Sequence, residues 1–94
     1  MDKLSKKEWE LYSWMKRGKQ RVIVLKAFPG HPITPQELRV KINEKEDVKL
    51  SLPEVSRHMT SFKGKGLVRC LDEGAPYSKH YELTDLGFKI EKHV

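Results

Sequence analysis

Two segments of the chain carry the same signal for the start of a helix. Thr34-Pro35-Gln36-Glu37 places a hydroxyl cap before a proline in the first turn, with a glutamate three residues after the cap. Ser51-Leu52-Pro53-Glu54 repeats this order further along the chain. The cap and the glutamate satisfy free N–H groups at a helix start, and proline loses nothing there because it has no N–H to donate. Two short capped helices joined by a turn predict a helix-turn-helix unit over residues 35–63.

The remaining elements complete a small, mainly helical fold. Apolar residues at helical spacing predict an N-terminal helix over 5–17, capped by Ser5 and Glu8, and a central helix over 19–28. After Gly66 the pattern changes to two strand-like runs, 67–72 and 79–83, joined by a turn at 73–76. Thr84 caps a last helix that continues to residue 94. We therefore expect one domain over 1–94, mainly α with a small β-hairpin at 67–83.

The helix after Ser51 has one apolar and one polar face. The apolar face, which we expect to be buried, carries Leu52, Val55, Met59 and Phe62. The opposite face carries one guanidinium and two hydroxyls, from Arg57, Thr60 and Ser61. Arginine pairs with guanine in the DNA major groove, and hydroxyls can contact bases or phosphates. The same face would also suit plain solvent, so both interpretations stay open at this point.

Charge placement favours a polyanionic partner. The chain has 19 Lys and Arg against 13 Asp and Glu, a net charge of +6. From residue 57 to residue 69 it holds no acid but four cations: Arg57, Lys63, Lys65 and Arg69. Lys79 and His80 follow on the returning strand. A basic cluster at one end of the polar helix is where phosphates would be met, although a solvated basic face is the plainer alternative.

Other classes of site find little support. Cys70 is the only cysteine, so no internal disulfide can form and a cytoplasmic location is expected. The histidines are too scattered for a zinc site, although a pairing of Cys70 with His80 across the hairpin is a remote alternative. Gly64-Lys65-Gly66 precedes a strand, where a phosphate loop should precede a helix. We expect no enzyme, cofactor, metal or small-molecule ligand, and no membrane segment.

Several segments resemble archaeal winged helix-turn-helix transcriptional regulators. Val55-Ser56-Arg57-His58-Met59, Gly66-Leu67-Val68 and the run Tyr81-Glu82-Leu83-Thr84-Asp85-Leu86-Gly87 are similar to the "VSRHL", "GLV" and "YxLTxxG" signatures of that group, which also occur in relatives of the MarR and ArsR regulators. The resemblance implies a winged helix-turn-helix with an additional N-terminal helix. The recognition helix would be 52–63 and the wing 67–83. Arg39, Gly64 and the acidic connection 44–49 depart from the pattern.

The resemblance and the charge pattern together predict the DNA contacts. Ser56, Arg57, Thr60 and Ser61 correspond to positions where the family meets DNA, and the expected phosphate or wing contacts are Lys63, Lys65, Arg69, Lys79 and His80. The expected partner is double-stranded DNA, bound by a regulator that reads two half-sites as a homodimer. An alternative is a protein-interaction module that binds no DNA, because fold alone does not settle function.

A second set of residues could form the dimer surface. They are the N-terminal aromatics Trp9, Tyr12 and Trp14 and the C-terminal residues Leu86, Phe88, Ile90 and Val94. The alternative is that these side chains close the core of the domain itself.

Overall fold

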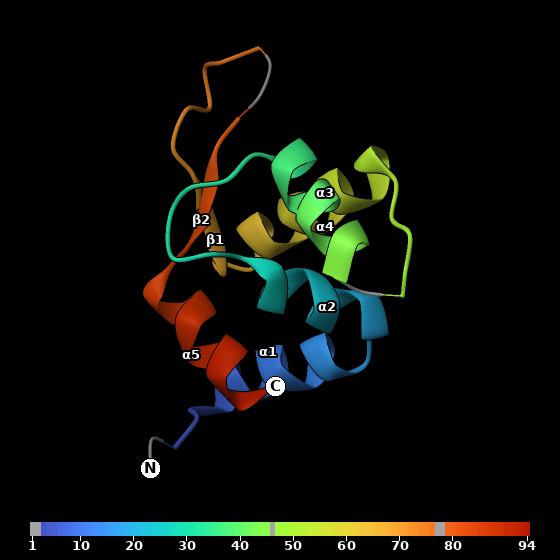
Figure 1. The fold of residues 1–94 in the computed structure, drawn as a ribbon. Coiled ribbons are helices and arrows are strands. Elements are labelled where there is room, and N and C mark those ends of the chain that lie inside the picture. The colour runs from blue at the N-terminus through green and yellow to red at the C-terminus, as the bar shows by residue number, and fades with distance from the viewer. Residues whose placement is uncertain (1–2, 46, 77–78) are drawn as a thin grey trace.

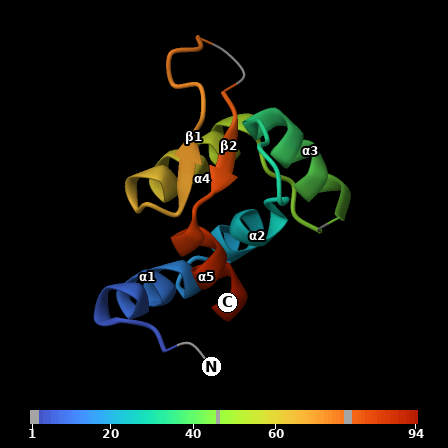
Figure 2. The same ribbon diagram turned by 90° about the vertical axis from the view of Figure 1, so that its left-hand side faces the viewer.

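The computed structural model describes residues 3–45, 47–76 and 79–94. In this part of the chain the elements follow in the order α1 (Lys6–Lys16), α2 (Lys19–Ala27), α3 (Pro35–Lys45), α4 (Leu52–Gly64), β1 (Val68–Cys70), β2 (Tyr81–Leu83) and α5 (Asp85–His93). Both views show the hairpin projecting at one end of the molecule and α1 and α5 lying at the other (Figures 1 and 2). Glu46 in the acidic connection and residues 77–78 of the expected wing lie outside the described residues.

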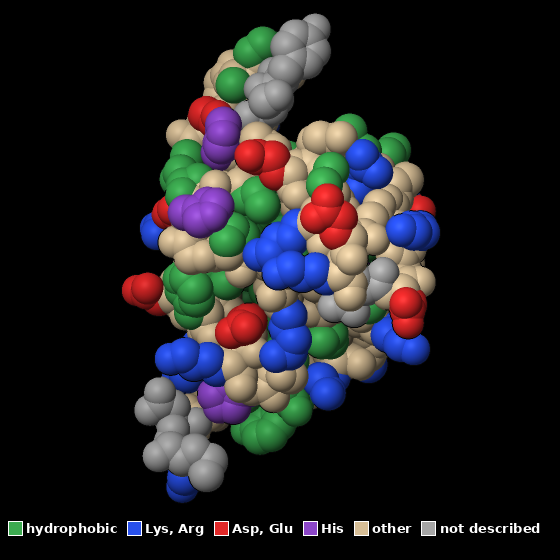
Figure 3. All heavy atoms as spheres, viewed as in Figure 1, with side chains coloured by type: hydrophobic (Ala, Val, Ile, Leu, Met, Phe, Trp, Pro, Cys, Tyr) green, Lys and Arg blue, Asp and Glu red, His purple; other side chains and the backbone are tan. Residues whose placement is uncertain are grey.

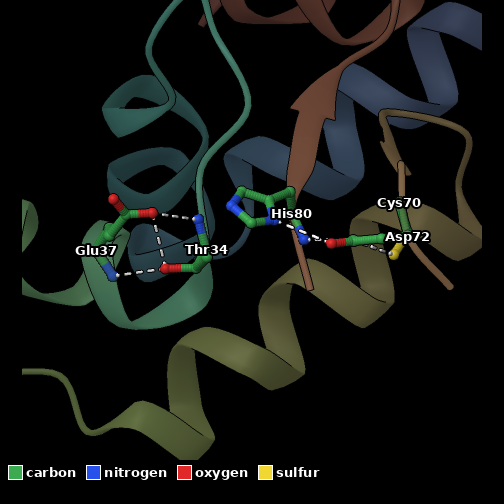
Figure 4. Close-up of polar contacts among 5 residues, drawn as sticks. All are labelled: Thr34, Glu37, Cys70, Asp72 and His80. Carbon is green, nitrogen blue, oxygen red and sulfur yellow. Dashed lines mark hydrogen bonds and ion pairs between the residues drawn. The ribbon is translucent and has the colours of Figure 1, made fainter. Parts of the chain in front are cut away.

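The helix starts lie where their capping residues predict them. Ser5 and Glu8 bond each other's backbone N–H groups at 3.2 and 2.8 Å, and so form a complete capping box before α1. At the start of α3 the Glu37 carboxylate accepts from the backbone and the hydroxyl of Thr34 (Figure 4). The hydroxyls of Ser51 and Thr84 accept from the third residues of α4 and α5. Local sequence therefore determines these four boundaries.

The core lies around α2, which packs against α1, α3, α4 and α5. Its buried centre is formed by aliphatic, methionine and phenylalanine side chains from every helix and from the base of the hairpin, including Met15, Val24, Leu25, Leu38, Ile42, Val55, Met59, Phe62, Leu67 and Ile90. The expected buried face of α4 is thus confirmed at Val55, Met59 and Phe62. It is wrong at Leu52, whose side chain is 41% exposed. Leu52 is the first residue of α4, and side chains tilt toward the helix N-terminus, so it reaches past the edge of the core.

The aromatic and C-terminal residues could form either a dimer surface or part of the core. In the structure some of them are buried and others are exposed. Ile90 is fully buried, and Tyr12, Trp14, Leu86 and Val94 are partly buried against the core. Trp9 and Phe88 remain 54% and 42% exposed. The core interpretation therefore holds for most of this set. Trp9 on α1 and Phe88 on α5 are the two that project outward.

The hairpin is shorter than the two strand-like runs predict. β1 and β2 are antiparallel, with Val68 opposite Leu83, Arg69 opposite Glu82 and Cys70 opposite Tyr81. Beyond them the N–H of His80 donates to the Asp72 carboxylate at 2.6 Å, which takes it out of the strand ladder. Leu67, expected in the strand, is instead buried in the core, and its carbonyl accepts from the Thr84 N–H at 3.0 Å.

A backbone bridge that the sequence does not predict joins the hairpin to the helical unit. Ile33 and Tyr81 exchange two N–H···O bonds, each of 2.9 Å, immediately before α3. At the other end of the hairpin, Gly66 adopts a φ of 78° and turns the chain out of α4 toward β1. This left-handed conformation suits glycine, which has no Cβ to clash. The hairpin is therefore tied to the start of α3 and to the end of α4.

Among the described residues, no helix has the length and apolar character that a membrane span requires.

Candidate nucleic-acid interface

Asn43 fixes the connection between α3 and α4. Its side-chain amide donates to the Leu50 carbonyl at 3.0 Å, and its side-chain oxygen accepts from the Leu50 N–H at 2.9 Å. This pair of bonds closes the turn just before the Ser51 cap, so α4 begins at a defined place relative to α3. The sequence shows only an asparagine in a helical pattern, and its partner could not be identified without the fold.

The outward face of α4 is polar, as the sequence predicts. Arg57, Thr60 and Ser61 are exposed, and Ser56 is half-buried. The Thr60 hydroxyl donates to the Ser56 carbonyl at 3.0 Å, which leaves its oxygen free to accept. Within the described residues, no hydrogen bond or ion pair engages the guanidinium of Arg57. This face therefore presents five donors from one arginine on the surface of a rigid helix.

Ser56 and Lys63 lie two helical turns apart on the side of α4 that faces the hairpin. Ser56 lines a hollow of about 300 Å³ between the starts of α3 and α4 and the hairpin. Apolar and polar residues line the hollow, with Lys79 as its one cation among the described residues: Thr34, Pro35, Gln36, Leu52, Ser56, Pro76, Lys79 and Tyr81. Its place beside the exposed face of α4 makes it continuous with the predicted interface.

Three of the side chains predicted to contact DNA, one on α4 and two on the wing, are paired with acidic residues. Lys63 forms an ion pair with Glu73, the Arg69 Nε atom lies 2.8 Å from a carboxylate oxygen of Glu82, and the His80 Nδ1 atom lies 3.0 Å from Asp72. The ion pair raises the pKa of Lys63 and lowers that of Glu73. The run from 57 to 69 is free of acids along the chain, but the hairpin supplies acids to it in space.

Asp72 bonds across the hairpin just beyond the ends of the two strands, on the side away from the core (Figure 4). Its carboxylate accepts from the backbone of His80 and contacts the ring, and these bonds lower the pKa of Asp72. The Cys70 Sγ atom lies 3.8 Å from the same carboxylate. No cluster of three or more His, Cys, Asp or Glu residues in the described part of the chain is arranged to hold a metal ion.

Lys65 and His58 lie on the other side of α4, toward α1 and α2. The Lys65 ammonium lies 5.0 Å from the centre of the Trp14 ring, and Arg21 packs on the same ring at 4.2 Å. His58 contacts Gln20 at 3.2 Å, and partial burial, followed by the charges of Arg21 and Arg57, lowers its pKa. Lys65 is thus separated from Arg69 and Lys79, with which the linear pattern grouped it.

Basic and acidic side chains are interspersed on the surface. Figure 3 shows this for the face over α2, α3 and α5, where Lys and Arg side chains alternate with Asp and Glu. On this face the basic side chains are therefore not gathered into one large basic field. Any selective contact has to come from particular side chains, and Arg57 is an exposed cation on the outward face of α4.

The helical pair α3–α4, the supporting helix α2 and the hairpin after α4 define a winged helix-turn-helix, with α1 added in front of it. The expectation of a mainly α fold with a small β-hairpin is confirmed.

Solved structures of TubR have this fold. A TubR mutant of type III plasmid segregation matches with a TM-score of 0.71 and 21% identity, over 98% of this chain and 91% of that chain. TubR bound to 24 base pairs of tubC from the pBtoxis plasmid of Bacillus thuringiensis serovar israelensis matches with a TM-score of 0.69 and 22% identity, over 99% and 95%. No protein-family model and no curated protein matches the chain. The likeness at this identity is one of fold.

Proposed function

We propose that this protein binds double-stranded DNA in a sequence-specific manner and regulates transcription. The observation that carries the proposal is the outward face of α4, where Arg57 stands exposed beside two hydroxyls on a helix fixed at both ends. An α-helix fits the major groove, and a bidentate arginine–guanine pair is the commonest specific contact made there. The proposed activity is DNA binding, without a chemical reaction.

The other predicted residues would position the helix. With α4 in the major groove, one sugar–phosphate strand would follow the hollow between α4 and the hairpin, near Ser56 and Lys79. Lys63, Arg69 and His80 would meet phosphates from the hairpin side of α4, and Lys65 from its α1 side. Phosphate contacts carry no sequence information but determine register and orientation. The exposed Leu52 at the start of α4 would lie against deoxyribose or a thymine methyl group.

The comparison with TubR supports the DNA partner and suggests a second role. TubR has been solved with 24 base pairs of tubC, so a chain with this fold can hold duplex DNA. TubR is described as a plasmid segregation protein, and a segregation role is therefore the second candidate for this chain. Mapping of bound sites in cells would separate the two roles, because a regulator binds at promoters, whereas a segregation protein binds a cluster of sites at one locus.

We further propose that two copies associate through the end of the molecule that lies away from the hairpin. Trp9 and Phe88 are exposed there, on α1 and α5, two helices joined by a 3.1 Å ion pair between Glu8 and Lys89. Oligomers most often have two-fold symmetry, and a dimer would present two recognition helices to two half-sites. Kinship with archaeal regulators belongs to the same proposal and rests on the sequence signatures. Action in the cytoplasm, where DNA is accessible, rests on the single cysteine of the chain.

Fluorescence anisotropy with a mixture of random duplexes tests the DNA partner. We expect binding at low salt, with log K falling linearly against log salt by about 0.9 for each phosphate contact. Absence of binding at low salt would overturn the proposal and favour the alternative of a protein-interaction module.

A further inference from the structure

Glu73 differs from two other acids of the hairpin, Asp72 and Glu82, in that it pairs with a residue of α4. Its carboxylate forms an ion pair with Lys63, which lies on the hairpin-facing side of the recognition helix. The pKa of Glu73 is lowered first by Lys63 and, more weakly, by the charge of Lys79. Glu73 therefore faces two of the cations that the interface would offer to phosphates. Glu82 and Asp72, by contrast, pair with residues of the hairpin itself, Arg69 and His80.

The Lys63–Glu73 pair is open to solvent. The side chains of Lys63 and Glu73 are 45% and 60% exposed, so nothing in the described fold shields either partner from an incoming phosphate. An exposed pair of this kind contributes little to stability, because water and salt screen it. The same pair has a direct effect on DNA binding, because a lysine cannot neutralise a phosphate fully while a carboxylate holds it.

We propose that Glu73 competes with DNA phosphates for Lys63 and thereby limits the sequence-independent affinity of the protein. This inference rests on the proposed DNA-binding function and deepens it. Sequence-independent binding derives almost entirely from the neutralisation of phosphates and the release of counterions. A carboxylate that keeps one cation occupied removes about one such contact from every duplex alike. Base contacts by Arg57 then account for a larger share of the affinity for a target site.

A charge-matched pair of variants tests this competition. Glu73→Gln removes the carboxylate, and Glu44→Gln makes the same change of charge at an exposed position on α3, at the end of that helix away from the hairpin. On random duplex DNA we expect Glu73→Gln to steepen the log–log salt dependence by about one and to raise affinity roughly five- to tenfold near 0.1 M salt. Glu44→Gln should change affinity far less.

A double-variant cycle identifies Lys63 as the cation involved. Lys63→Gln should weaken binding only slightly in the parent protein, where Glu73 already holds the lysine, but should abolish the gain in the Glu73→Gln background. Circular dichroism of each variant checks that the fold is retained. Equal gains from Glu73→Gln and Glu44→Gln, or equal losses from Lys63→Gln in both backgrounds, would overturn the inference. If the parent protein binds no duplex at any salt concentration, the proposed function itself fails.

Discussion

In the proposed DNA complex, Arg57 and Lys65 would make two different kinds of contact, one to a base and one to the sugar–phosphate backbone. Arg57 projects from the outward face of α4 and would read a base, whereas Lys65 at its end would meet the backbone. We expect Arg57→Ala to lower affinity for a selected target by about 1–3 kcal/mol while affecting random DNA much less. Lys65→Ala should weaken all sequences alike. Equal losses for Arg57→Ala on target and random DNA, measured by anisotropy, would remove Arg57 from the base-reading role.

His58 links stability to pH in the neutral range. Partial burial lowers its pKa below the ordinary 6.5, and Arg21 on α2 and Arg57 on α4 lower it further, against a raising effect of Glu54. The unfolded chain therefore takes up this proton at higher pH than the folded chain does. The contribution of His58 to the free energy of unfolding is therefore complete above about pH 6.5. The free energy of unfolding should decrease as the pH falls below that value, by at most about 1.4 kcal/mol per pH unit.

The variant His58→Gln isolates this effect, because glutamine keeps a polar side chain beside Gln20 but does not titrate. Urea unfolding between pH 7.5 and pH 5 should show a flatter dependence for His58→Gln than for the parent. Asp72 and Glu37 do not interfere in this window, because their pKa values are lowered from 3.8 and 4.5. Parallel pH profiles for parent and variant would rule out His58 as the group responsible.

Among the elements, α5 packs against the base of the hairpin, just before β1, and Gly87 lies at this contact. A Cβ at Gly87 would overlap the carbonyl oxygen of Leu67, so no side chain fits there. Gly64, at the end of α4, has open space around the corresponding position. We expect Gly87→Ala to lower the free energy of unfolding by roughly 3 kcal/mol, the upper end of the cost of overpacking. Gly64→Ala should raise it by about 0.5–1 kcal/mol.

Chemical denaturation of the two glycine variants checks this contrast. The pair is informative because both changes add one methyl group within or beside a helix. A Gly87→Ala protein as stable as the parent would mean that α5 can move away from Leu67, and the position of α5 against the hairpin would then need revision.

The elements also show which parts of the fold are encoded locally. The four capped helix starts could be predicted because the cap and its partner lie three residues apart in the chain. The Ile33–Tyr81 bridge and the Asn43–Leu50 bonds could not, because each joins residues whose proximity depends on the tertiary fold. The hairpin bounds were overestimated for a related reason, since the Asp72 side chain takes a backbone N–H that the strand pattern assigns to the ladder.

The candidate site was predictable in its residue types and less so in its electrostatics. The polar face of α4 follows from helical periodicity, and Arg57, Thr60 and Ser61 are exposed as expected. The acid-free run from 57 to 69 suggested an unopposed basic surface, but Glu73 and Glu82 reach it from the hairpin. Sequence spacing reports charge along the chain and not across a turn, so pairings of this kind require the structure.

For the whole molecule, the main prediction concerns association. Trp9 is 54% exposed at the end of the molecule opposite the hairpin, and its burial between two copies would remove a large apolar surface from water. Sedimentation velocity should show a dimer for the parent and a shift toward monomer for Trp9→Ala. Leu71→Ala is the matched control, because Leu71 is 51% exposed but lies at the hairpin. A monomer at high concentration, unchanged by Trp9→Ala, would contradict the proposed interface.

We propose above all that α4 reads guanine in the major groove through Arg57. The most direct test selects a preferred duplex from a random library and then replaces its guanines one at a time with 7-deazaguanine, which lacks the N7 acceptor on the major-groove edge. If Arg57 reads a guanine, one replacement should weaken binding of the parent protein about tenfold or more and leave binding of Arg57→Ala unchanged. Failure to enrich any sequence, or equal weakening of both proteins by every replacement, would contradict it.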